Sequence, residues 1–136
     1  MRTLFFFILF QSAISLFAQQ ENRLSTLDFV EILNGNKKEA YFYYHNNWEK
    51  LREAALKKGY IHSYEIMKTS ATEDAPFDLV LMTTYNNRAA YENRENRFSE
   101  LIEQAGQLKL LNSKKPNEFR KTLFSKERVE HLNTKM

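Results

Sequence analysis

The chain has 136 residues, which is enough for one domain and too few for two of ordinary size. It contains no cysteine, which excludes a disulfide scaffold, thiolate metal sites and thiol catalysis. The 20 Lys and Arg residues against 17 Asp and Glu give a net charge of +3, too balanced for a typical nucleic-acid-binding domain.

The first 18 residues have the pattern of a secretory signal. Arg2 precedes an unbroken apolar run over residues 4–10, and smaller residues follow up to Ala18. The whole apolar stretch of about 15 residues is shorter than the about 20 that a membrane-spanning helix needs. We therefore expect cleavage after Ala18, with residues 13–15 as an alternative site. The mature domain, residues 19–136, is expected to be exported to a periplasm or secreted, with no membrane segment.

The first half of this domain predicts a strand, a helix and a strand. Residues 26–33 alternate between two apolar faces, as a strand does. Residues 37–58 contain neither glycine nor proline and space their apolar residues by three and four, which predicts one long helix. Gly59 is placed to end this helix in a left-handed conformation, and residues 60–68 follow as the second strand.

The second half predicts a strand, a helix and a last strand. Residues 77–85 are the most apolar segment of the domain and predict the third strand. The asparagine pair at 86–87 can cap a helix that extends to about residue 105, because asparagine side chains accept free backbone N–H groups. The stretch 107–117 is poorly patterned and allows a short helix. The mixed pattern of residues 121–129 predicts the fourth strand.

This order of elements predicts an α+β fold of the ferredoxin-like, split βαβ kind, with a four-stranded antiparallel sheet and helices on one face. The third strand carries Leu79 and Leu81 on one face, and Val80 and Met82 on the other. A sheet covered on one side only would show polar residues on its second face. The two helices suffice for one face, so we expect a homodimer in which two copies pack sheet against sheet.

The blocks 29–67 and 77–103 resemble the dimeric α+β barrel superfamily, in which two ferredoxin-like subunits join their sheets into one barrel. The segments Asn47–Arg52 and Lys58–Tyr64 are similar to exported NIPSNAP-like and ABM-like domains of that superfamily. The resemblance implies a homodimer of this fold. It does not imply one activity, because the superfamily includes heme-degrading and quinol monooxygenases, chlorite dismutases, isomerases and stress proteins.

Three residues of the second predicted strand are candidates for catalysis. His62 lies between Tyr60 and Tyr64 on one face of that strand. A histidine among tyrosines can act as a base or bind heme iron. The alternative is a partly buried histidine bonded to a tyrosine hydroxyl or a water. His45 and His131 are expected at the surface, and the histidine spacing predicts no metal site.

Aromatic residues gather on the first helix, at positions 41–44 and at Trp48. They predict a groove for a flat apolar ligand such as a quinone or porphyrin, and a core or dimer interface is the alternative. The predicted ligand-binding residues are Tyr44, Trp48, His62, Tyr85 and Arg94. Arg94, beside the apolar face of the second helix, is either an anion clamp, part of an ion pair with Glu31 or Glu65, or a side chain whose charged end reaches solvent.

The sequence thus favours an exported homodimeric domain that binds a small apolar or aromatic ligand, or that is structural. No cofactor, metal, nucleic acid or membrane partner is expected for it. The alternative is a cofactor-independent or heme-linked monooxygenase or isomerase acting on a small aromatic or apolar substrate.

Overall fold

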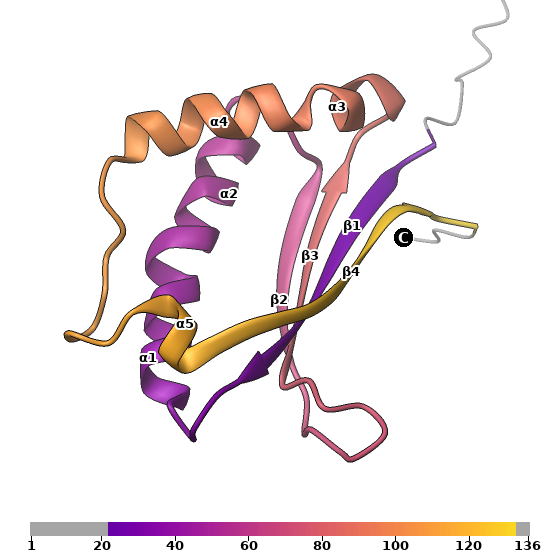
Figure 1. Ribbon diagram of the computed structural model, residues 1–136. Coiled ribbons are helices and arrows are strands. Elements are labelled where there is room, and N and C mark those ends of the chain that lie inside the picture. The colour runs from indigo at the N-terminus through magenta and orange to yellow at the C-terminus, as the bar shows by residue number, and fades with distance from the viewer. Residues whose placement is uncertain (1–21, 133–136) are drawn as a thin grey trace, which may run out of the picture.

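A computed structural model describes residues 22–132, which form one antiparallel sheet and a layer of helices (Figure 1). The predicted export signal and its cleavage site lie outside the described residues. The strands are β1 (Leu24–Ile32), β2 (Ser63–Lys68), β3 (Leu79–Tyr85) and β4 (Arg120–Glu130). The helices are α1 (Lys37–Tyr43), the π-helical η1 (Tyr44–Trp48), α2 (Glu49–Lys57), α3 (Arg88–Glu92), α4 (Arg94–Ala105) and α5 (Pro116–Phe119). Across residues 22–132, no helix is both long and apolar enough to cross a membrane.

The sheet has the strand order β2-β3-β1-β4, and every pair of neighbours is antiparallel. The predicted α+β class and four-stranded antiparallel sheet are confirmed, and the arrangement is consistent with a ferredoxin-like fold. Asp28 in the middle of β1 lies opposite Leu81 of β3 and Ser125 of β4. This register decides which residues meet on the face that the helices cover.

Apolar side chains occupy both faces of the sheet. Val30, Leu79 and Leu81 pack with Tyr44 under the helices. Because successive strand residues point to opposite faces, the neighbours of these residues lie on the other face. That second face, here called the outer face, carries Leu27, Phe29, Met67, Val80, Met82 and Phe124. Met67 is 37% and Phe124 46% exposed, so this face is apolar and partly open.

The helix predicted over residues 37–58 forms as three consecutive segments, α1, η1 and α2, rather than as one regular α-helix. Side chains explain the π-helical middle. Asn46 and Asn47 donate from Nδ2 to the carbonyl oxygens of Phe42 and Tyr43, at 2.8 and 2.9 Å. Such side-chain bonds compete with the backbone bonds of a regular helix.

Gly59 ends α2 as predicted, with φ +71°. The Tyr60 amide donates to the Ala55 carbonyl at 2.9 Å and the Gly59 amide to the Leu56 carbonyl at 3.1 Å, which is a Schellman motif. This turn takes up Tyr60, so β2 begins at Ser63. The predicted strand start at residue 60 is therefore wrong by three residues.

The second helix begins as predicted, because Asn87 Oδ1 accepts from the Ala90 amide at 2.8 Å. It is interrupted at Asn93, which separates α3 from α4. It ends at Gly106, with φ +74°. The fourth predicted strand is confirmed as β4, and the short helix α5 precedes it directly.

Candidate functional site

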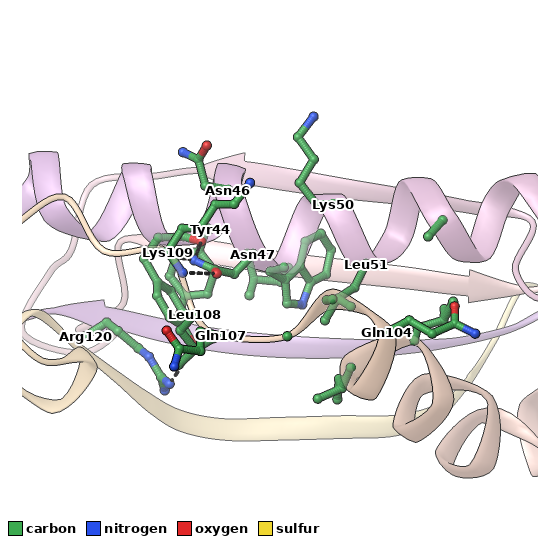
Figure 2. Close-up of a pocket in the computed structure, with 18 of the residues that line it drawn as sticks. Tyr44, Asn46, Asn47, Lys50, Leu51, Gln104, Gln107, Leu108, Lys109 and Arg120 are labelled. Atoms are coloured by element: carbon green, nitrogen blue, oxygen red, sulfur yellow. Dashed lines mark hydrogen bonds between the residues drawn. The ribbon is translucent and has the colours of Figure 1, made fainter.

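A cavity of about 620 Å³ lies between the helices and the sheet (Figure 2). Residues of α1, η1 and α2 form one wall, the sheet forms the floor, and the end of α4 with residues 106–109 forms the second wall. The lining residues are Asp28, Tyr43, Tyr44, Asn46, Asn47, Trp48, Lys50, Leu51, Ala54, Leu81, Leu101, Ile102, Gln104, Ala105, Gly106, Gln107, Leu108, Lys109, Arg120 and Thr122.

The floor combines apolar residues with two opposite charges. Asp28 lies beside Leu81, and its Oδ1 accepts a hydrogen bond from Ser125 Oγ at 2.5 Å. Arg120 lies opposite Ile32, four residues farther along β1 than Asp28. At 3.3 Å per residue, the two charged residues are about 13 Å apart along the strand. They form no ion pair with each other in the described structure, so neither charge neutralises the other.

Aromatic rings form the helical wall near Arg120. The rings of Tyr43 and Tyr44 meet edge to face, with centroids 5.2 Å apart. Burial raises the pKa of the Tyr44 hydroxyl, so this group stays protonated and can donate a hydrogen bond. Trp48 continues the aromatic wall along η1. This half of the cavity therefore offers flat apolar surfaces and a neutral donor.

Arg52 stacks on Trp48 and is not itself part of the cavity lining. Its guanidinium carbon lies 4.2 Å from the centre of the Trp48 ring and 4.4 Å from that of Phe98. Its Nε donates to Thr83 Oγ1 at 3.2 Å. Burial lowers the pKa of Arg52 to about 10, which leaves it charged at neutral pH. The indole is thus fixed by stacking, and Arg52 itself does not line the cavity.

Arg120 differs from Arg52 because its hydrogen-bonding capacity is only partly used. Its Nη2 donates to the Tyr43 hydroxyl at 3.2 Å, and its guanidinium lies 5.0 Å from the centre of that ring. Its Nε is buried without a hydrogen-bond partner among residues 22–132. No carboxylate in that range lies within 4.0 Å of it. Leaving a buried donor unpaired costs about 1–3 kcal/mol, and because this Nε is closed off, a further acceptor would have to meet the Nη groups of Arg120.

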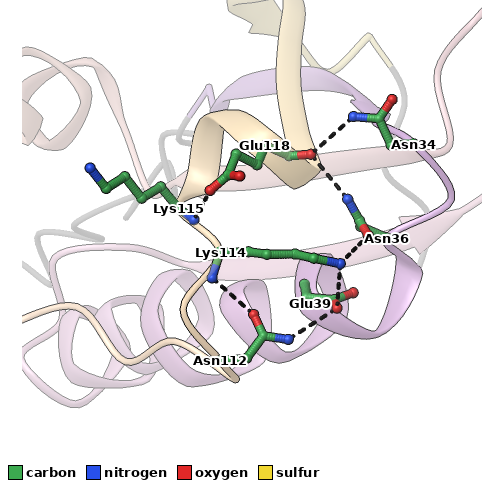
Figure 3. Close-up of polar contacts among 7 residues, drawn as sticks. All are labelled: Asn34, Asn36, Glu39, Asn112, Lys114, Lys115 and Glu118. Carbon is green, nitrogen blue, oxygen red and sulfur yellow. Dashed lines mark hydrogen bonds and ion pairs between the residues drawn. The ribbon is translucent and has the colours of Figure 1, made fainter.

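A polar cluster fixes the chain just before Arg120 (Figure 3). Glu39 Oε1 accepts from Asn112 Nδ2 at 3.1 Å and from Lys114 Nζ at 3.2 Å. The Glu118 carbonyl accepts from Asn36 Nδ2 at 3.1 Å. These contacts tie α5 and the residues before it to the start of α1. The position of Arg120 at the beginning of β4 follows from this anchoring.

Asn47 holds the loop that closes the second wall. Its Nδ2 donates to the Lys109 carbonyl at 2.8 Å, and its Oδ1 accepts from the Lys109 amide at 2.7 Å (Figure 2). The loop therefore hydrogen-bonds to an asparagine side chain instead of a neighbouring strand. This contact keeps Gln107 and Leu108 beside the aromatic wall.

Two of the predicted ligand-binding residues, Tyr44 and Trp48, line this cavity. Tyr85 does not. It is 3% exposed and packs edge-on against Tyr91 in the core between the sheet and α3, with ring centroids 5.5 Å apart. Because its ring is enclosed by the core, it presents no surface to this cavity.

Arg94 also lies away from the cavity. Its guanidinium covers the Tyr91 ring at 4.0 Å, and its Nη2 lies 3.6 Å from Glu127 Oε1 and 3.9 Å from Glu95 Oε1. The prediction that Arg94 pairs with Glu31 or Glu65 is wrong. The start of α4 faces the far end of β4, which brings Glu127 within reach.

None of the three candidate catalytic residues lines the cavity. His62 precedes β2 instead of lying in the middle of it, and its amide donates to the Thr84 carbonyl at 2.7 Å. Tyr64 packs edge-on against Trp48, 6.0 Å between centroids. Tyr60 lies under the guanidinium of Arg97 at 4.6 Å. The three residues therefore do not form a common site in this cavity.

The cavity lining contains no histidine, cysteine or methionine to ligate a heme iron, and burial keeps the Tyr44 hydroxyl protonated. His45 Nδ1 lies 2.6 Å from Glu49 Oε2 on the helix surface, and His131 Nε2 lies 2.7 Å from Ser25 Oγ. Between residues 22 and 132, no group of three histidine or acidic side chains is arranged to hold a metal ion.

The residues that sequence reasoning missed are Asp28, Asn47 and Arg120. A signal existed for Asp28, because it shares a face with the apolar Val30 and Ile32 of the first strand. For Asn47, the signal is the pair of consecutive asparagines inside a long helical pattern. Asparagine has a low helix propensity, so such a pair indicates that its side chains bond to nearby backbone. Arg120 adjoins the poorly patterned stretch, and its role depends on long-range contacts alone.

No protein-family model matches the chain, and no curated protein sequence matches it. Among solved structures, it is similar to the crystal structure of HapK from Hahella chejuensis. The TM-score is 0.52 with 10% sequence identity, over 83% of this chain and 97% of HapK. At this identity the likeness shows a shared fold and no more.

Proposed function

We propose that this protein binds a small, mainly apolar ligand with a flat aromatic part, in the cavity between its helices and its sheet. The observation that carries the proposal is the cavity of about 620 Å³, with Tyr43, Tyr44 and Trp48 along one wall. Pockets of about 300–1,000 Å³ with apolar and aromatic walls and a few polar groups are typical of small-molecule sites.

The arrangement of the walls supports an aromatic ligand. Trp48 is stacked on Arg52 and so keeps one orientation, which makes it a rigid surface for a flat ring. Leu51, Leu81 and Leu101 extend the apolar surface beyond it. A rigid, preformed cavity binds at a lower entropic cost than one that must order on binding.

We further propose that the protein is an exported homodimer with the ferredoxin-like subunit of the dimeric α+β barrel superfamily. The outer face of the sheet supports the dimer, because Phe29 stacks on Phe124 at 4.5 Å and meets Phe77 at 4.9 Å on a partly open surface. An exposed apolar patch of this kind marks an interaction site. N-terminal sequencing of the mature protein tests export, which requires a chain that begins at Gln19 or, if the alternative site is used, just after residue 15.

Ligand binding can be tested through Trp48, the single tryptophan of the chain. The probe is a neutral aromatic molecule, biphenyl-4-carboxamide, titrated into the mature protein with excitation at the red edge of tryptophan absorption. We expect a saturable change in emission with one probe per chain, because the indole forms part of the cavity wall.

A pair of variants distinguishes the cavity from the rest of the surface. Ala54→Phe places a ring inside the cavity and should weaken binding about tenfold or more, because the probe loses its space. Ala89→Phe makes the same change at an exposed position of α3 and should have no effect. A wild-type protein without saturable binding, or equal effects of the two variants, would contradict the proposed function.

A further inference from the structure

The cavity has one polar, cationic end and one apolar end. Arg120, Tyr43 and Gln107 lie at the first end, and Leu51, Ala54 and Leu101 lie toward the second. Figure 2 shows Arg120, Gln107 and Tyr44 at one side of the view and Leu51 farther along the helix. Tyr43 and Ala54 are 11 helix residues apart, which gives the cavity a length of about 16 Å at 1.5 Å per residue.

We propose that this site selects an elongated aromatic carboxylate, whose acidic group binds the Arg120 guanidinium and whose apolar part extends toward Leu101. The inference rests on the proposed function, since it names the class of ligand for the same cavity. It goes beyond that function by assigning a charge, an orientation and a specificity-determining residue.

The unpaired state of Arg120 is the first support. Its Nε is buried without a partner, and its Nη2 is bonded to a neutral phenol. The half-buried Arg94 has carboxylates within 4.0 Å, whereas Arg120 has none among residues 22–132. Because the Nε is closed off, a ligand carboxylate would accept two parallel hydrogen bonds from the two Nη groups of the guanidinium.

The surroundings of Arg120 are the second support. Lys50 and Lys109 also line the cavity, but the Lys50 ammonium is paired with Glu53 at 3.0 Å and points away in Figure 2, and Lys109 is exposed. The negative charge of Asp28 lies about 13 Å along β1 from Arg120 and disfavours an acidic group in the middle of the cavity. The acid of a bound ligand is therefore directed to the Arg120 end.

The aromatic rings set the shape of the ligand. Tyr43 and Tyr44 flank the Arg120 end, and Trp48 follows one turn later. A ring attached directly to the carboxylate would lie between these side chains, and the rest of the ligand would contact Leu51 and Leu101. A short aliphatic acid would leave this apolar end empty.

The test compares two probes of nearly equal shape, biphenyl-4-carboxylate and biphenyl-4-carboxamide, by isothermal titration calorimetry at pH 7.5. We expect the wild-type protein to bind the carboxylate at least tenfold more tightly than the amide. Arg120→Gln should remove that preference by weakening the carboxylate at least tenfold and leaving the amide within about twofold.

Arg97→Gln is the matched control, because Arg97 also lies over a tyrosine ring and is outside the cavity. It should leave the preference for the carboxylate intact. Arg120→Lys keeps the positive charge and should retain part of the preference. If Arg120→Gln does not fold, the comparison of the two probes on the wild-type protein still tests whether the site selects an acid.

The outcomes separate this inference from the proposed function. Equal binding of both probes by the wild-type protein overturns the selection of an acid and leaves the apolar binding function standing. A carboxylate preference that survives Arg120→Gln overturns the role of Arg120. Binding of neither probe counts against both the inference and the proposed function.

Discussion

Tyr91 shows how a single buried polar atom can be a cost of the fold. The residue is 1% exposed, and its hydroxyl has no hydrogen-bond partner among the described residues. Its ring makes stabilising contacts, because it packs edge-on against Tyr85 at 5.5 Å and lies under the Arg94 guanidinium at 4.0 Å. The contacts of the ring and the burial of the hydroxyl can therefore be separated by one substitution.

We expect Tyr91→Phe to leave the free energy of unfolding unchanged or to raise it by about 1 kcal/mol, because the variant removes an unpaired buried group and keeps the ring. Urea denaturation followed by circular dichroism measures the change. The comparison variant is Tyr43→Phe, which deletes the acceptor of the Arg120 hydrogen bond and should cost about 1 kcal/mol. A clear loss of stability in Tyr91→Phe would show that its hydroxyl is paired in solution.

Arg120 and Arg94 illustrate what one sequence can say about individual residues. Arg94 was predicted as a ligand clamp or an ion pair from its place beside an apolar helix face, and in the structure it is an ion pair. Arg120 had no such pattern, because its side-chain partner Tyr43 belongs to α1 and lies 77 residues away in the sequence. Periodicity shows which face of an element a side chain occupies, and it does not show what lies opposite.

At the level of the elements, α5 and the loop before it are held by a small electrostatic cluster. Glu39, in the first turn of α1, receives hydrogen bonds from Asn112 and Lys114 (Figure 3). Its own backbone N–H, followed by Asn112 and Lys114, holds the pKa of the Glu39 carboxyl below its ordinary value. A carboxyl with a lowered pKa in the folded state stabilises the fold only while it is ionised.

We therefore expect Glu39→Gln to lower the Tm at pH 7, where the carboxylate of the wild-type protein is fully ionised. The stabilisation is complete above the unfolded-state pKa, near 4.5, and is lost as the pH falls through the lower folded-state pKa. The Tm difference between the two proteins should narrow below about pH 4.5 and close near pH 2. Thermal denaturation across this pH series measures it.

Glu73→Gln is the control, because Glu73 is exposed in the segment between β2 and β3. It should shift the Tm little at any pH. A Tm difference for Glu39→Gln that stays constant from pH 7 to pH 2 would contradict the role given to the ionised carboxyl.

Most helices and strands could be predicted from the sequence. Their ends could be predicted where a nearby glycine or capping side chain determines them. Gly59 and Gly106 end their helices because both adopt positive φ, and Asn87 caps α3 through its side chain. The start of β2 was not predicted, since the turn after Gly59 takes up residues that still alternate as a strand would. The π-helical segment depends on Asn46 and Asn47, whose side-chain bonds a hydrophobic pattern does not reveal.

At the level of the whole molecule, the main feature is the apolar outer face of the sheet. Phe29, Phe77 and Phe124 form one aromatic group there, with ring centroids 4.5–6.4 Å apart. Met67 and Phe124 stay partly exposed. A second copy of the chain carries the same surface. In a dimer with a two-fold axis, the two aromatic groups would pack against each other, and both outer faces would be covered.

We expect the mature protein to be a dimer at micromolar concentration and Phe124→Asp to be a monomer. In a dimer, the new carboxylate would be buried in an apolar interface without a partner. Burying an unpaired charge costs free energy, so the variant should dissociate. Size-exclusion chromatography with light scattering measures the mass, and the near-ultraviolet circular dichroism of the variant shows whether each subunit keeps its packing.

The matched control is Leu56→Asp, since Leu56 is 45% exposed against 46% for Phe124 and lies on α2 instead of the outer face. It introduces the same charge at the same exposure and should leave the dimer intact. A wild-type protein that stays monomeric at about 100 μM would overturn the dimer. Dissociation by Leu56→Asp as well would contradict an interface confined to the outer face, because a charge on α2 disturbs an interface where the helices take part in it.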